Sequence, residues 1–168
     1  MPSERWIAEL GLSEALDRLQ HRIAEGTGSE HLIPFAEALQ WVYSLHEYHR
    51  LTHPDFFNQA AAHPAGETLG AIVYARGLLT HRMADVTRLI GSRPFRLDIS
   101  RLGGGDTLGG SGIQVYWANL AALPAPGRPE RHSRDVFYDR HLSGVPLLEP
   151  FGPVHDWLTG RPEPSRGA

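Results

Sequence analysis

Apolar residues recur at helical spacing over the first half of the chain, and this pattern predicts a series of helices. A short helix is expected to open at Ser3 and to break at Gly11, and a second helix is expected from Ser13. A longer helix, from about residue 31 or 34 to residue 53, ends before Pro54. Further helices are expected at 55–62 and 66–90. The opening helix carries Trp6, Ile7 and Leu10, and the second helix is expected to place Leu16, Leu19 and Ile23 on one face. The side chains of the longer helix that are expected to face inward are Phe35, Leu39, Val42, Leu45 and either Tyr48 or His49.

The last third of the chain changes to an alternating pattern. Apolar and polar residues alternate from Phe95 to Ser100 and again from Ile113 to Trp117, with glycine-rich residues 103–112 between them. This order predicts a β-hairpin formed by 95–101 and 113–117. A short helix is expected at 133–142, with Gly144 after it, and a proline-broken segment carries Val154, Trp157 and Leu158.

The predicted fold is therefore mainly α: a helical bundle with an appended two-stranded β-hairpin and short C-terminal helices. The length of 168 residues suits one domain. We expect that domain to span 1–160, with the hairpin as an insertion at about 95–117 and 161–168 as a flexible tail.

Composition narrows the range of functions. The chain has no cysteine, which excludes disulfides and thiolate chemistry, and no apolar run reaches the roughly 20 residues that a membrane span needs. No membrane association and a cytoplasmic location are expected. All 16 basic residues are arginine, and the net charge of −3 argues against a large non-specific nucleic-acid surface.

Arg76 is the most informative candidate residue, because it interrupts an apolar helical stripe. The stripe is expected to comprise Leu69, Ile72, Val73, Arg76, Leu79, Thr80, Met83, Val86 and Ile90. A guanidinium keeps its charge, so on a core-facing stripe it needs an anionic or strongly polar partner. That partner is either a carboxylate of the chain, such as Glu37, Glu47 or Asp85, or a phosphate from outside.

His81 follows Arg76 by five positions. This spacing places the two side chains about 140° apart around a helix and roughly 7.5 Å apart along it, so that they can flank one groove. Gly70, Gly77 and Ala84 form a strip of small residues on the same helix, which permits the close approach of another backbone. The strip indicates either tight packing within the bundle or a dimer seam with two His81 side chains at a shared cleft.

His46, His49 and His53 form a second candidate constellation. They share one face of a helix, and imidazoles at this spacing suit zinc and other first-row metals. Ordinary core or surface histidines fit the pattern better, so no metal is expected. The glycine-rich residues 103–112 lack the Gly-Lys-Ser/Thr signature of a phosphate-binding loop.

Three features together resemble a known family. The helix with Tyr74-Ala75-Arg76-x4-His81 follows one that carries Trp41, Tyr43 and Tyr48, and it precedes Val115-Tyr-Trp117 and a Tyr138-x3-Leu142-x-Gly144 segment. In this the chain is similar to the HEPN superfamily, and within it to uncharacterised actinobacterial and phage proteins with an Arg-x4-His motif. The resemblance covers roughly residues 35–157.

The resemblance implies a metal-independent endoribonuclease of a toxin–antitoxin or phage-defence system. Arg76 would hold the scissile phosphate, and His81 would act as general base or acid on the ribose 2′-hydroxyl. Tyr74 would position substrate. No cofactor is implied, and the expected partners are RNA, a second copy of the chain as a homodimer, and an antitoxin or other protein.

Two alternatives stay open. Gly77 stands where the family usually has a polar residue after the arginine, which favours a catalytically inactive HEPN-like module that binds a protein partner or a nucleotide. The weaker alternative is a metal protein that uses His46, His49 and His53.

Overall fold

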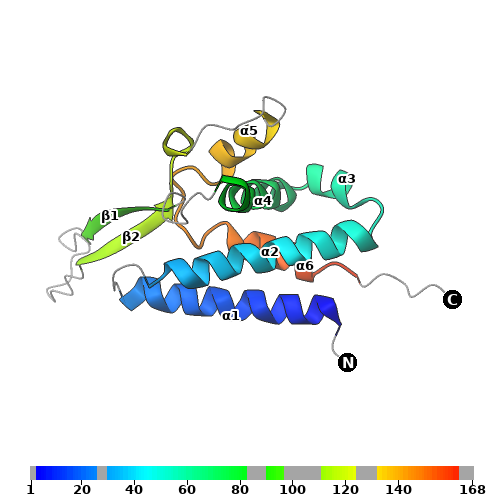
Figure 1. The fold of residues 1–168 in the computed structure, drawn as a ribbon, viewed down its shortest axis with the longest axis horizontal. Coiled ribbons are helices and arrows are strands. Elements are labelled where there is room, and N and C mark those ends of the chain that lie inside the picture. The colour runs from blue at the N-terminus through cyan, green and yellow to red at the C-terminus, as the bar shows by residue number, and fades with distance from the viewer. Residues whose placement is uncertain (1–2, 26–29, 83–89, 97–110, 124–131, 163–168) are drawn as a thin grey trace, which may run out of the picture.

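A computed structural model describes residues 3–25, 30–82, 90–96, 111–123 and 132–162. It is mainly helical with one two-stranded antiparallel sheet, as the hydrophobic pattern predicts (Figure 1). The elements are α1 (Glu4–Glu25), α2 (Leu32–Thr52), α3 (Phe56–Ala61), α4 (Pro64–Arg82), β1 (Ile90–Arg96), β2 (Ser111–Trp117), the 3-10 helix η3 (Leu120–Ala122), α5 (His132–His141) and α6 (Phe151–Thr159).

The helices form layers around one core. α1 and α2 lie side by side, α4 packs across the other side of α2, and α5 covers α4 (Figure 1). α6 contacts both α2 and α4, and the hairpin projects from one end of the bundle. The core contains the predicted inward residues of α2, namely Phe35, Leu39, Val42 and Leu45. Of the two alternatives, His49 is buried and Tyr48 is half-buried.

The predicted break at Gly11 is wrong, because α1 runs without interruption from Glu4 to Glu25. A side chain at Gly11 would meet the indole of Trp41, with its Cβ only 2.4 Å from Cε2, so the glycine lets α2 approach closely. The buried face of α1 consists of Arg5, Ala8, Leu12, Ala15 and Leu19. Of the residues expected to share one face, Leu19 is fully buried and Leu16 and Ile23 pack against the core while partly buried, whereas Trp6, Ile7 and Leu10 are exposed.

The predicted helix over 66–90 is corrected at both ends. α4 starts at Pro64 and is described to Arg82, and Ile90 already belongs to β1. Its buried face includes Ala71, Ala75 and Leu78 besides the expected Leu69 and Ile72. The face is thus rotated from the predicted stripe, and Arg76 lies half-buried at its edge.

The predicted β-hairpin is confirmed, but its first strand begins earlier than expected. β1 and β2 pair antiparallel from Ile90 opposite Trp117 to Arg96 opposite Ser111, and residues 97–101 lie outside the described part. Gly91 permits this pairing, because a Cβ there would lie 2.3 Å from the ring of Tyr116.

Trp117 carries the hairpin into the core. Its ring is fully buried and packs edge-on against Phe35 at 5.1 Å, while its indole N–H donates to the Leu147 carbonyl at 3.1 Å. The hydroxyl of Tyr138 donates to the Ala118 carbonyl at 2.9 Å. Gly144, which adopts a left-handed φ of 73°, donates its backbone N–H to the Trp117 carbonyl. The Tyr138-x3-Leu142-x-Gly144 segment and Trp117 are therefore one packing unit.

Arg5 joins the two ends of the described chain. Its side chain is buried, and its guanidinium donates to the carbonyls of Thr159 at 2.6 Å and Arg161 at 2.8 Å. The guanidinium also pairs with Glu9 at 2.6 Å. Arg161 in turn binds Gln59. Arg161 was expected in a flexible tail, but it is held in place by these contacts, and residues 163–168 lie outside the described part.

Within the described ranges, none of the helices has both the length and the apolar character that crossing a membrane requires.

Replacement of Arg5 by leucine should lower the free energy of unfolding by about 2 kcal/mol, because it leaves the α6 carbonyls and Glu9 without their charged donor. Arg18→Leu is the matched control, since Arg18 is half-exposed and pairs with Glu37 at the surface; a change within about 0.5 kcal/mol is expected there. Urea denaturation of both variants measures the difference. Equal effects would contradict the anchoring role of Arg5.

Candidate functional site

A row of polar and aromatic side chains on α2 faces the groove toward α4. The row, which we call the α2 ridge, consists of Gln40, Tyr43, His46, Glu47 and Arg50. These positions repeat at intervals of three or four residues and so lie on one side of the helix. The ridge borders the buried side of α2 described above, and the packing of that side fixes the direction in which the ridge points.

The α2 ridge holds Arg76 of α4. The Nη2 of Arg76 donates to the side-chain oxygen of Gln40 at 3.0 Å, and its Cζ lies 4.0 Å from the centre of the Tyr43 ring. A guanidinium over an aromatic face is attracted by the negative π surface. Both groups are uncharged, and together they orient the half-buried guanidinium where α2 and α4 meet.

The carboxylates suggested from the sequence as partners of Arg76 are engaged elsewhere. Glu37 accepts from Arg18 at 2.6 Å, and Glu47 accepts from Arg50 at 2.7 Å. Asp85 lies outside the described residues. On the α2 side, Arg76 is therefore contacted by a side-chain amide and an aromatic ring rather than by Glu37 or Glu47.

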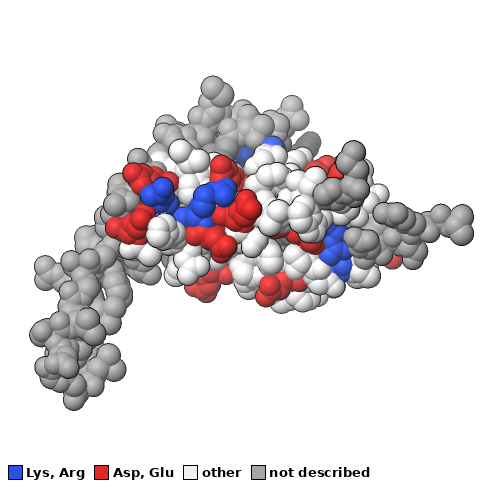
Figure 2. Space-filling view, turned by 90° about the horizontal axis from the view of Figure 1, so that it is seen from below, with Lys and Arg blue, Asp and Glu red and all other residues white. Residues whose placement is uncertain are grey.

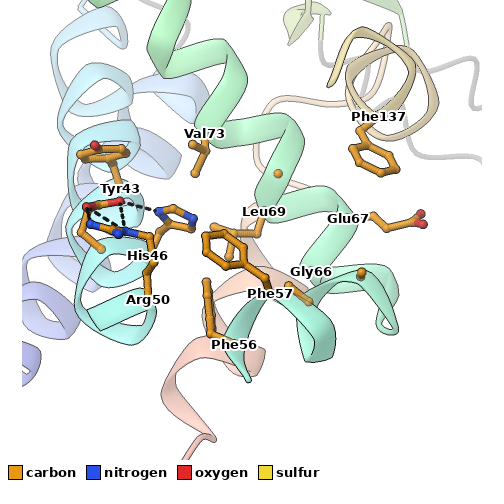
Figure 3. A pocket seen from close by; sticks show the side chains of 14 residues that line it. Tyr43, His46, Arg50, Phe56, Phe57, Gly66, Glu67, Leu69, Val73 and Phe137 are labelled. Carbon is orange, nitrogen blue, oxygen red and sulfur yellow. Dashed lines mark hydrogen bonds and ion pairs between the residues drawn. The ribbon is translucent and has the colours of Figure 1, made fainter. Parts of the chain in front are cut away.

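A cavity of about 420 Å³ lies next to Arg76, between α2, α3, α4 and α5 (Figure 3). Its volume is within the range of small-molecule sites. Figure 3 shows Tyr43 and His46 on one wall, Phe56 and Phe57 on α3 below, and Phe137 of α5 on the opposite side. Rings thus form several sides of the cavity, together with aliphatic and charged side chains. Tyr43 belongs to both places, since it lines the cavity and supports Arg76.

Ion pairs provide the polar groups at the cavity. Arg50 binds Glu47 through both Nε and Nη2, and this contact lowers the pKa of the Glu47 carboxyl. The ionised Glu47 lies 3.2 Å from Nδ1 of His46, which favours a proton on that nitrogen. Across the cavity, Glu67 accepts from His141 at 2.9 Å and lies 3.4 Å from Arg140. The charges around the cavity thus largely balance.

The other residues proposed from the sequence lie in different surroundings. Tyr74 is only 3% exposed, and its ring packs against Tyr138 at 6.2 Å, so it offers no face to a ligand at the surface. His81 belongs to the last turn of α4, but its side chain lies outside the described part of the structure. Along α4, the residues that line the cavity come first, Arg76 follows them, and His81 lies in the last turn.

The small-residue strip is divided between two environments. A Cβ at Gly70 would lie 3.8 Å from Phe137, so α5 covers this part of α4 within the chain. A Cβ at Gly77 would meet nothing within 4 Å. Ala84 lies outside the described residues. In the described part of the strip, the Gly77 position therefore faces open space.

The histidines considered as metal ligands do not surround a common point. His46 packs against Phe56 and Phe57 at the cavity, whereas His49 is fully buried and contacts His53, with 3.4 Å between their Nδ1 atoms. Nε2 of His53 lies 3.0 Å from the Pro162 carbonyl. No group of three histidine or acidic side chains within the described ranges is arranged to hold a metal ion.

The face of the molecule below α1 carries charges of both signs. Figure 2 shows that acidic side chains surround the arginines there. Arg18 pairs with Glu14 and Glu37, and Arg22 pairs with Glu25 and Glu30. Ion pairs exposed to water leave little net attraction for an anion. The described part of this face thus presents no continuous positive surface.

The sequence prediction identified Arg76 but not the α2 ridge that orients it. Gln40, Tyr43 and His46 were considered separately or not at all, although their spacing of three residues along a helix with a firmly predicted apolar side places them together. The signal is that these residues lead from the edge of the apolar side, at His46, to the polar side, at Gln40.

The buried His49 should make stability depend on pH. Burial, the adjacent His53 and the Arg161 guanidinium lower the pKa of His49 from 6.5 to about 4. Between pH 6.5 and about pH 4, His49 therefore binds a proton in the unfolded chain but not in the folded chain. The free energy of unfolding should fall as the pH drops through this window, by about 1.4 kcal/mol per pH unit and on the order of 3 kcal/mol in total.

His49→Gln should remove this contribution, so urea denaturation between about pH 4.5 and 6 should give a shallower pH slope than wild type. His21→Gln is the control, because the His21 side chain is 71% exposed on α1 and should leave the slope unchanged. The same slope in His49→Gln and wild type would show that His49 does not titrate this way.

No model of a known protein family matches the chain, and neither a curated protein nor a solved structure is significantly similar to it.

Proposed function

We propose that the protein is a HEPN-like, metal-independent endoribonuclease, with Arg76 as the phosphate-binding residue and His81 as the proton-transfer residue. The observation that carries the proposal is the position of Arg76. Its guanidinium is oriented by Gln40 and by Tyr43, which also lines a cavity, and it lies on the helix that continues to His81. An arginine oriented in this way is suited to bind a phosphate oxygen, because its guanidinium is planar and always charged.

The chemistry requires one proton acceptor and one proton donor. The ribose 2′-oxygen attacks the adjacent phosphorus while its proton passes to His81 of one copy, and the bond from phosphorus to the 5′-oxygen breaks as that oxygen takes a proton from His81 of the second copy. The products are a 2′,3′-cyclic phosphate and a 5′-hydroxyl. Arg76 stabilises the negative charge that develops on the phosphate oxygens.

The second candidate is a non-enzymatic module of the same kind that binds a nucleotide or a protein partner. The open position at Gly77 favours it, because no polar side chain follows Arg76 there to assist catalysis. In this case Arg76 serves binding alone.

The purified protein should cleave single-stranded RNA in the presence of EDTA and leave 2′,3′-cyclic phosphate ends. His81→Ala should slow cleavage by roughly 10²- to 10⁴-fold, the usual effect of removing a general acid or base. His21→Ala is the matched control, since its imidazole is on the exposed surface of α1. Intact RNA after incubation with wild type, or equal rates for wild type and His81→Ala, would leave only the binding module.

A homodimer in which two copies of α4 meet should sediment at about twice the 18.6 kDa chain mass at micromolar concentration. Gly77→Arg should shift it to monomer, because the added side chain fills the open part of the strip. Gly152→Arg is the control, as that glycine is exposed on α6 and also faces open space. Dimers that resist Gly77→Arg but dissociate with Trp6→Glu would place the interface on the exposed apolar side chains of α1 instead.

A further inference from the structure

We infer that the cavity between α2, α3, α4 and α5 binds one base of single-stranded RNA, that of a nucleotide whose phosphate lies on Arg76. The inference rests on the proposed function and names a subsite for its substrate. It is derived from the shape of the cavity, its charge and its connection to Arg76.

The walls of the cavity suit a planar ring. Tyr43, His46, Phe57 and Phe137 present ring atoms to a space of about 420 Å³ (Figure 3). Stacking on aromatic side chains is the usual way in which proteins hold unpaired bases, and every base has a face that can stack. Phe57 is 59% exposed on the short helix α3, so a ligand ring would cover an apolar side chain that otherwise remains in water.

Glycine keeps the cavity open on the α4 side. A Cβ at Gly70 would stand 3.8 Å from Phe137, and a longer side chain would occupy the space before that ring. Glycine in the middle of a helix costs roughly 1 kcal/mol relative to alanine. The helix therefore carries a destabilising residue at the point where a side chain would reduce the cavity.

The charges favour a base rather than a phosphate inside the cavity. Glu47 is paired with Arg50, and Glu67 lies near Arg140 and His141, so the walls carry little net charge. Their carboxylate oxygens and guanidinium N–H groups are acceptors and donors for the edge of a base. Arg76, by contrast, carries a fixed positive charge, and Gln40 and Tyr43 orient its guanidinium. A neutral ring in the cavity and a phosphate at Arg76 thus match the two environments.

Tyr43 connects the two subsites. Its ring lies under the Arg76 guanidinium at 4.0 Å and also forms part of the cavity wall. A nucleotide bound across Tyr43 therefore places its base and its phosphate in adjacent positions on the same ridge of α2. His81 follows farther along α4 on the side of Arg76 away from the cavity.

The test uses the full chain carrying His81→Ala, with fluorescence anisotropy of labelled eight-nucleotide probes. One set of probes has bases (oligo-A, oligo-U and oligo-C), and the matched probe has the same ribose-phosphate backbone without bases. We expect at least one base-containing probe to bind roughly 5- to 150-fold more tightly than the abasic probe, the range for stacking of one base. Adding Gly70→Leu should remove most of that difference, and adding Gly152→Leu on α6 should preserve it.

Phe57→Ala provides an independent variant, because its exposed ring contributes little to the core, and it should lower the same ratio. Equal binding of base-containing and abasic probes, or a ratio unchanged by both Gly70→Leu and Phe57→Ala, would overturn the base subsite even where wild type cleaves RNA. A third outcome is that the protein cleaves no RNA but binds base-containing probes more tightly, and that these variants reduce the difference. This outcome would support the subsite and reject the ribonuclease.

Discussion

The burial of Trp117 is the interaction on which the other parts of the structure depend. Its ring contacts Phe35 of α2, Phe151 of α6 and Tyr138 of α5, so three helices meet on one side chain at the end of the hairpin. Backbone hydrogen bonds from residues 144–147 to β2 fix the strand from the other side. Because a buried indole must satisfy its N–H, the bond to the Leu147 carbonyl restricts the ring to one orientation. The direction of α5, and with it the position of Phe137 at the cavity, follows from this arrangement.

Hydrophobic periodicity predicted the main elements because most of them bury large side chains at regular spacing. Phe35, Leu39 and Val42 determined the correct side of α2 for this reason. The same rule failed for α1, where Ala8 and Ala15 are buried while the larger Trp6 and Leu10 are exposed. Small residues at a close helix contact carry a weak periodic signal, and a glycine such as Gly11 resembles a break when it in fact permits contact with Trp41.

The candidate site was only partly predictable. Arg76 was recognisable because a charge on an apolar helix requires a partner. Its partner depends on the rotation of α4 against α2, and a shift of the buried face toward Ala75 and Leu78 moved Arg76 from the core to the edge, over Tyr43. The cavity depends on four helices at once, and residues distant in sequence such as His46 and Phe137 become neighbours only in the folded chain. A local pattern cannot contain that information.

The contacts that Arg5 makes with the carbonyls of Thr159 and Arg161 have a consequence for synthesis on the ribosome. α1 emerges first, but a charged side chain on its buried face has no backbone partner until the end of α6 has been translated. The nascent protein must therefore hold α1 and α2 together with an unfinished contact for most of translation. Completion of the bundle is thereby linked to the emergence of residue 161, because only then can the Arg5 guanidinium exchange water for the carbonyls of Thr159 and Arg161.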